Sequence, residues 1–112
     1  MAHYLVEARP KSGLRELKER LDSGELKAMR PFGSALDHSL NTARMRADGI
    51  AVWEEEDYCS PPLAMEREAV LDSYFTDIQV EPVRPGEGWA SIEELPSLWD
   101  EVAAAEANKP QV

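Results

Sequence analysis

Residues Phe32 to Tyr58 read FGSALDHSLNTARMRADGIAVWEEEDY, and this stretch predicts a long β-hairpin. Asp48 and Gly49 supply the turn, because glycine adopts positive φ freely and aspartate tolerates the left-handed region better than most residues. The apolar residues 50–53 begin the returning strand. A hairpin of this length in the middle of the chain would supply two neighbouring strands of a sheet.

The flanking segments predict an alternation of strands and helices. Residues 3–9 alternate as a strand with one clean apolar face, and three leucines then recur at helical spacing between Ser12 and Gly24. After the hairpin, Ser60 begins a second helix that reaches Tyr74. The remaining segments are a strand at 77–83, a linker at 84–88, a last helix at 97–107 that Ser91 introduces with a capping box, and a frayed end at 108–112.

This order of strand, helix, strand, strand, helix, strand predicts an α+β, ferredoxin-like βαββαβ core at residues 1–83. Its four-stranded antiparallel sheet would be covered by two helices on one face. Residues 84–112 add a linker and an acidic C-terminal helix, which docks on its own or the partner subunit. The uncovered face keeps Leu5 and apolar residues of the hairpin, and such a patch usually marks an interface. We therefore expect a C2 homodimer.

Composition narrows the class of protein. The chain has 112 residues, enough for one domain, and 43% of them are hydrophobic. The net charge of −10 makes nucleic acid an unexpected partner, because phosphate binding needs a basic face. No window approaches the roughly 18 apolar residues that span a bilayer, so we expect no membrane association. The lone cysteine, Cys59, agrees with a reducing, cytoplasmic location.

Three short motifs resemble a known family. Residues 23–26 (SGEL), 30–33 (RPFG) and 78–83 (IQVEPV) are similar to the YCII-related family, within the dimeric α+β barrel superfamily. The resemblance covers residues 3–83 and implies a homodimer with a cleft between sheet and helices in each subunit. Relatives of this kind include isomerases, lyases and monooxygenases. YCII-like proteins are associated with a histidine after the first strand, whereas residues 9–12 here contain none.

The predicted outgoing strand of the hairpin carries the candidate catalytic residue, His38. Leu36, His38 and Leu40 alternate, so their side chains would share one face. An imidazole between two leucines is a candidate general acid or base, because burial moves its pKa across neutrality. The other interpretation is a half-buried histidine that is hydrogen-bonded to the backbone or to an interface partner.

The candidate binding residues are Arg44, Trp53, Tyr58 and Cys59, and the hairpin register pairs three of them. A two-residue turn would place Arg44 opposite Trp53, which predicts a cation–π contact worth about 0.5–1 kcal/mol. It would also place His38 opposite Cys59, where an imidazole could activate a thiolate. A longer loop would change every pairing. The alternative, which the pattern favours, is that Cys59 is an inert, half-buried thiol after a strand.

Residues 54–57 form a run of four carboxylates. A hard cation or a basic partner could bind such a run. Alternate residues of a strand point apart, however, so the pattern favours a strand end that runs into solvent. A set of His3, Glu7 and His38 across adjacent strands is an alternative metal site. We expect neither a metal nor a cofactor.

Two functions follow from these features. The fold pattern and His38 favour a small homodimeric protein whose cleft binds a small organic molecule, with the activity of a YCII-like lyase or isomerase. The alternative is a non-enzymatic interaction or regulatory module that uses the acidic C-terminal helix as its contact, because Trp99 lies on an apolar stripe of that helix.

Overall fold

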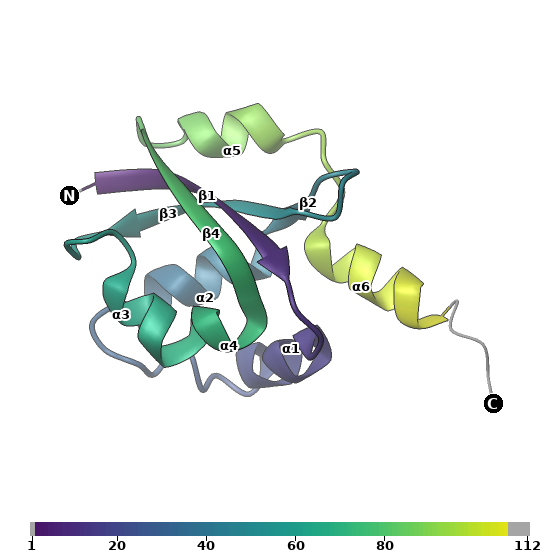
Figure 1. Ribbon diagram of the computed structural model, residues 1–112. Coiled ribbons are helices and arrows are strands. Elements are labelled where there is room, and N and C mark those ends of the chain that lie inside the picture. Colours follow the sequence, from purple (N-terminus) through teal and green to yellow (C-terminus); the bar gives the residue numbers. More distant parts are fainter. Residues whose placement is uncertain (1, 108–112) are drawn as a thin grey trace.

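The computed structural model describes residues 2–107 and shows an α+β fold with one central sheet (Figure 1). The strands are β1 Ala2–Pro10, β2 Arg44–Met45, β3 Ala51–Asp57 and β4 Phe75–Val83. The helices are α1 Leu14–Asp22, α2 Gly33–Asn41, α3 Ala64–Glu66, α4 Asp72–Tyr74, α5 Glu87–Ile92 and α6 Leu98–Ala107, and the π-helical segment η1 Arg67–Leu71 joins α3 to α4. The predicted fraying of residues 108–112 lies outside the described residues.

The four strands form one antiparallel sheet in the order β2-β3-β1-β4. β1 pairs with β3 on one side and with β4 on the other. Val6 and Ala8 point into the core and are fully buried, whereas Arg9 is exposed, as the twofold period of a strand requires. The predicted α+β class and the four-stranded antiparallel sheet are confirmed, and the predicted strands at 3–9 and 77–83 lie within β1 and β4.

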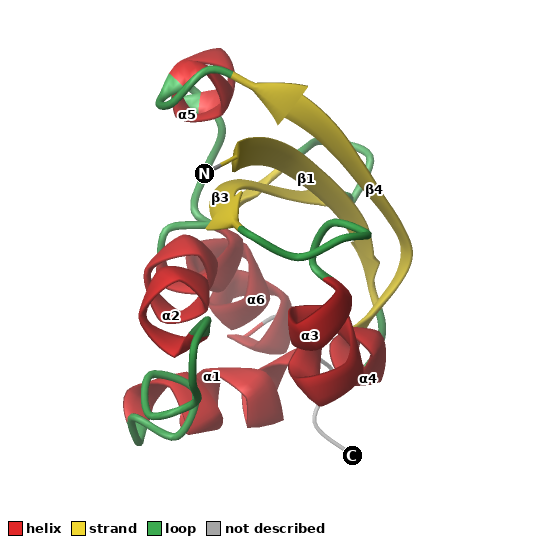
Figure 2. Cartoon of the chain, turned by 90° about the vertical axis from the view of Figure 1, so that its left-hand side faces the viewer, coloured by secondary structure: helices red, strands yellow, loops and turns green. Residues whose placement is uncertain are grey.

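Helices cover both faces of the sheet, but unequally. Figure 2 shows α1, α2, α3, α4 and α6 on one side and α5 alone on the other. The core lies under the larger layer and includes Val6, Leu17, Leu36, Leu40, Trp53, Leu71 and Phe75. α5 contacts β1 and β3 from the opposite side. The premise that the chain's own helices roof only one face was therefore wrong, while the homodimer inferred from it stays a prediction.

Residues 33–41 are a helix, so the prediction of an outgoing strand there was wrong. Leu36 and Leu40 are both fully buried, but they share a helical face because they lie four residues apart. The segment contains no β-branched residue, which removes the usual preference for a strand. Gly33 begins the helix where an added Cβ would lie 2.4 Å from the Leu26 carbonyl oxygen. Only glycine allows this close approach of two backbone segments.

The hairpin itself is short, and its predicted register was wrong. Arg44 lies opposite Val52 rather than Trp53. The Arg46 N–H donates to the Ile50 carbonyl over 2.9 Å, so the loop has three residues instead of two. Gly49 adopts a φ of 85°, as its place in the predicted turn required.

The helix after the sheet's third strand begins later than Ser60. Leu63, with a φ of 63°, precedes α3, and no side chain of residues 2–107 caps that helix. At the first helix, Gly13 takes the capping position predicted for Ser12, while the helix itself is confirmed as α1. Ser91 lies inside α5 and does not introduce the last helix.

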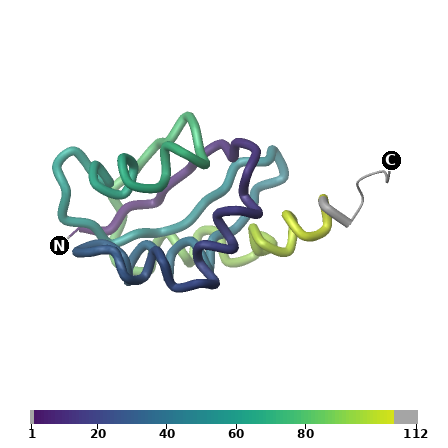
Figure 3. The backbone as a smooth tube through the Cα atoms, turned by 90° about the horizontal axis from the view of Figure 1, so that it is seen from below, coloured from purple at the N-terminus to yellow at the C-terminus, as the bar shows by residue number. Residues whose placement is uncertain are grey.

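α6 confirms the predicted helix at 97–107 and packs against its own chain. Leu98 is fully buried, and the Trp99 indole N–H donates to the Leu40 carbonyl over 2.7 Å. Figure 3 shows α6 at one end of the molecule beside α1, with which it is in contact. Among the helices of residues 2–107, none has the length and apolar character that crossing a bilayer requires.

Candidate functional site

A cavity of about 650 Å³ opens where the end of β3 meets α2 and α3. We call it the carboxylate pocket, because three of its ten lining residues are acidic and none is basic. Its lining residues are Pro31, Phe32, Ser34, Ala35, Glu56, Asp57, Tyr58, Cys59, Met65 and Glu66. Residues from three separate segments of the chain therefore build one site.

β3 delivers its acidic residues to both faces of the sheet. Glu55 and Asp57 continue the core-facing side that begins with Trp53, and both are at least 95% buried. Glu54 points to the other face and is also buried. The prediction that residues 54–57 run into solvent was therefore wrong. None of the ion pairs among residues 2–107 joins an arginine or a lysine to this run.

Asp57 organises the loop that forms one wall of the pocket. Its Oδ2 accepts the Leu63 N–H over 2.6 Å and the Cys59 N–H over 3.2 Å. Leu63 is held in the left-handed region, an unfavourable conformation for a branched residue. Burial would raise the pKa of Asp57, but the hydrogen bonds that its carboxylate receives, first from the Leu63 N–H and then from Glu66, together outweigh burial and lower the pKa. Asp57 is therefore an anion at neutral pH.

Glu66, from α3, meets Asp57 and Cys59 at the base of the pocket. Its Oε2 lies 3.8 Å from the Cys59 Sγ, and one ligand atom from each of the three residues lies within 4.8 Å of the other two. Glu66 is fully buried, yet its Oε1 has no hydrogen-bond partner among residues 2–107. Buried carboxyl oxygens without a partner are costly, so such an atom points to a proton or a ligand.

Glu55 lies behind Glu66 and interacts with it. The Glu55 Oε1 accepts the Trp53 indole N–H over 3.0 Å, and its Oε2 has no partner among the described residues. Burial raises the pKa of Glu55 to about 8, against the Trp53 N–H, and the charges of Glu66 and Asp57 add to the rise. Burial and the neighbouring Asp57 raise the pKa of Glu66 to about 7. The pair therefore keeps a proton at neutral pH.

Cys59 is not an activated nucleophile. The Met65 N–H lowers the pKa of its thiol, but burial and the charges of Asp57 and Glu66 together outweigh that effect and raise it. His38, its predicted partner, lies on α2, is exposed, and lines a different cavity, of about 460 Å³. The predicted pairing of His38 with Cys59 was therefore wrong. His38 instead meets the edge of Trp89, with ring centroids 6.4 Å apart.

The other predicted binding residues are spread over the molecule. Trp53 is fully buried in the core, where its ring packs on Phe75, so the predicted cation–π contact with Arg44 was wrong. The Arg44 guanidinium donates to the Leu95 carbonyl over 2.7 Å. Tyr58 does line the pocket: it is 73% exposed at the rim and donates its hydroxyl to the Glu56 Oε1 over 3.0 Å. Of the four predicted binding residues, Tyr58 and Cys59 therefore line the carboxylate pocket.

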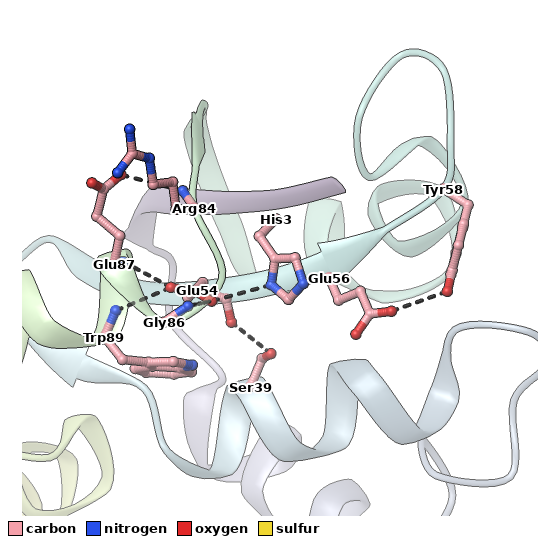
Figure 4. Close-up of polar contacts among 10 residues, drawn as sticks. His3, Ser39, Glu54, Glu56, Tyr58, Arg84, Gly86, Glu87 and Trp89 are labelled. Atoms are coloured by element: carbon pink, nitrogen blue, oxygen red, sulfur yellow. Dashed lines mark hydrogen bonds and ion pairs between the residues drawn. The ribbon is translucent and has the colours of Figure 1, made fainter. Parts of the chain in front are cut away.

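Glu54 lies on the opposite face of the sheet, where its carboxylate binds backbone N–H groups at the start of α5 (Figure 4). Its Oε1 accepts the N–H groups of Gly88 and Trp89, and its Oε2 accepts that of Gly86 and lies 3.2 Å from the His3 Nδ1. Burial opposes ionisation of Glu54, but these hydrogen bonds prevail and lower its pKa. Because every contact of this carboxylate is internal, we assign it a structural role.

The alternative metal set of the sequence prediction does not assemble. His38 lies on a helix rather than on a strand next to β1. His3 pairs with Glu54, and Glu7 pairs with Arg46. Within residues 2–107, the one group of donors close enough to share an ion is that of Asp57, Cys59 and Glu66.

Sequence reasoning considered Glu55 and Asp57 only as part of an acidic run and favoured a solvent-exposed strand end, and it missed Glu66. A signal for two of them was present: once Trp53 is placed in the core, the twofold period of β3 carries Glu55 and Asp57 to the same face. Glu66 gave no such signal, because its position depends on the path of the loop between β3 and α3.

Comparison with known proteins adds no family to these observations: the chain matches no family model, and it matches neither a curated protein nor a solved structure.

Proposed function

We propose that this protein binds a small organic molecule in the carboxylate pocket and moves a proton on it, as a lyase or an isomerase does. Glu66 is the residue that carries this proposal. It lines the pocket, is fully buried, and leaves its Oε1 without a hydrogen-bond partner among residues 2–107. The proton that Glu55 and Glu66 share can bridge the two carboxyls, and a ligand in the pocket would be a further partner for Glu66.

The size and walls of the pocket support ligand binding. A volume of about 650 Å³ lies within the range of roughly 300–1,000 Å³ that is typical of small-molecule sites. Phe32, Met65 and Ala35 provide apolar surface, while Asp57 and Glu66 provide polar groups that can orient a ligand. An apolar cavity with a few convergent polar groups is the usual form of a binding site.

The acid–base properties of Glu66 suit proton transfer. A pKa of about 7 lets the carboxylate take a proton from an acidic carbon of the ligand and the resulting carboxyl return it. If Glu66 returns the proton to a neighbouring carbon, the reaction is an isomerisation. If Glu66 gives the proton to a departing group, the reaction is an elimination. Glu55 holds a proton beside Glu66, and the negative charge of Asp57 disfavours a second negative charge on Glu66.

The test is hydrogen–deuterium exchange on 2-indanone, a neutral cyclic ketone with acidic C–H bonds. In D₂O, NMR should show that the protein accelerates exchange at the α-carbons, with a half-maximal rate near pH 7, where Glu66 titrates. Glu66→Gln keeps the shape of the side chain but cannot take a proton. Because general acid–base catalysis contributes about 10²–10⁴-fold, this variant should lose at least about a hundredfold in rate.

Glu68→Gln is the matched control, since Glu68 is exposed on η1 only two residues away. It should exchange at the rate of the unchanged protein. Equal rates for Glu66→Gln and for the unchanged protein would refute the role of Glu66, and no acceleration by either would refute the proposed proton transfer.

We also propose the ferredoxin-like arrangement, the YCII relation and the dimeric α+β barrel. The sheet order β2-β3-β1-β4, with helices between β1 and β2 and between β3 and β4, supports the first. The pocket lies between the sheet and its helices, where the resemblance places a cleft. Light scattering should therefore give twice the chain mass of 12.5 kDa. A mass of one chain in dilute solution would contradict the dimer.

The alternative, an interaction module that uses the acidic C-terminal helix, has less support. Leu98 and Trp99, the apolar residues that suggested a foreign partner, pack on the chain itself. The cytoplasm stays the predicted location.

A further inference from the structure

We infer that the carboxylate pocket is built for an organic ammonium ion with an apolar body. This inference rests on the proposed function, because it names the ligand class of the same pocket. It concerns binding alone, so it can be tested without turnover.

The charge of the pocket favours a cation. Glu56, Asp57 and Glu66 line it, and no lysine, arginine or histidine is among the lining residues. Backbone N–H groups keep the pKa of Asp57 low, so at least this carboxylate is charged at neutral pH. A bound carboxylate or phosphate would meet like charge in a partly desolvated site, whereas an ammonium group would be attracted.

The hydrogen-bonding groups of the pocket point the same way. The Leu63 and Cys59 N–H groups both donate to the Asp57 Oδ2, and the buried Glu66 Oε1 is an acceptor without an assigned partner among residues 2–107. A primary ammonium group offers three donors and no acceptor. It therefore suits the carboxyl groups of Asp57 and Glu66, which each place an oxygen within 4.8 Å of the other, and a bond to a charged carboxylate is charge-assisted.

The remaining walls require more than an ion. Phe32, Met65, Pro31 and Ala35 surround the acidic end with apolar side chains, and Tyr58 lies at the rim. A metal ion on Asp57, Cys59 and Glu66 would leave this apolar space unfilled. An amine with an aromatic or aliphatic body would fill it.

Three probes with the same body and different end groups test the inference. The probes are 2-phenylethylamine, 2-phenylethanol and 3-phenylpropanoate, each titrated by calorimetry at pH 7 with and without EDTA. The amine should bind at least about tenfold more tightly than the alcohol, as one added charge-assisted hydrogen bond would give. The carboxylate should bind more weakly than the alcohol.

Two variants assign the preference to named residues. Glu66→Gln and Asp57→Asn should each lower the affinity for the amine at least about tenfold and leave the affinity for the alcohol within about twofold. Unchanged alcohol binding shows that the pocket is still folded, and Glu68→Gln should bind all three probes as the unchanged protein does. If Asp57→Asn does not fold, Glu66→Gln alone decides.

The inference is overturned if the carboxylate binds as tightly as the amine, if Glu66→Gln leaves the preference intact, or if EDTA abolishes it, because the bound cation is then a metal ion. It stands, and the proposed reaction fails, if the amine is preferred but 2-indanone does not exchange. If 2-indanone exchanges but the amine is not preferred, the proposed reaction stands and the ligand class is refuted.

Discussion

Raising the pH from about 5 to about 8 is expected to lower the free energy of unfolding by on the order of 3 kcal/mol, and Glu55→Gln should remove at least half of that loss. The pKa of Glu55 is about 8 in the folded protein, well above the ordinary value of a glutamate in an unfolded chain. Between these two values the folded state holds a proton that the unfolded state has released. Stability therefore falls as the pH rises through this window and levels off above it.

Glu55→Gln removes this titration without removing the hydrogen bond to Trp53. The amide oxygen can still accept the indole N–H, and the amide N–H₂ can donate to Glu66, whose buried oxygen lacks a partner among residues 2–107. At about pH 8 the variant should be more stable than the unchanged protein by about 2 kcal/mol. Urea unfolding at several pH values measures the effect.

Glu68→Gln is again the control, and its stability should follow that of the unchanged protein at every pH. Glu54 and Asp57 do not contribute to the change in unfolding free energy between about pH 5 and pH 8, because their pKa values are lowered. The stability that they contribute is lost only when the pH falls below the ordinary pKa values of carboxylates, which is more acidic than the tested range. A stability that is flat or rises between about pH 5 and pH 8 would contradict the buried, protonated pair.

Gly33→Ala is expected to cost about 3 kcal/mol or more, or to prevent folding. A Cβ at this position would lie 2.4 Å from the Leu26 carbonyl oxygen and 2.7 Å from that of Lys27. Both are backbone atoms, so no side chain can turn away to make room. The start of α2 would have to move, and with it Phe32 and Ser34, which line the carboxylate pocket. Thermal or urea unfolding gives the size of the loss.

Gly24→Ala separates this crowding from the usual cost of replacing a glycine. Gly24 has a φ of 82°, but a Cβ there would meet nothing within 4 Å. Its replacement should cost only about 1 kcal/mol, through backbone strain. Equal losses for the two variants would mean that α2 does not pack against residues 26 and 27 as described.

The helix at 33–41 shows where the sequence is ambiguous. Leu36 and Leu40 lie four residues apart, a spacing that suits both a helix face and alternate positions of a strand. His38 between them fits the strand pattern only if it is buried, and it is exposed on α2. The helix is favoured by packing with distant residues, such as the contact of Gly33 with Leu26, which no local pattern reveals. β1, α1, β4 and α6 could be predicted, because one clear period runs through each of them.

The candidate site was less predictable than the fold. The sequence predicts that Glu55 and Asp57 are surface residues, because buried carboxylates are rare. Their burial follows from Trp53, which fixes the face of β3 that turns to the core. Glu66 joins them through a loop that is held by hydrogen bonds to Asp57 and by the left-handed Leu63. Such a meeting of distant side chains depends on tertiary structure, and no local pattern in the sequence indicates it.

The retained proton is tested most directly by ¹³C NMR of the glutamate carboxyl carbons as a function of pH. Two carboxyls should titrate near neutrality, one at about pH 7 and one at about pH 8, and the first signal should vanish in Glu66→Gln. If every carboxyl instead titrates below about pH 5, in the range of exposed glutamates, then Glu55 and Glu66 are ionised at neutral pH. The proton-transfer site proposed for the carboxylate pocket would then be refuted.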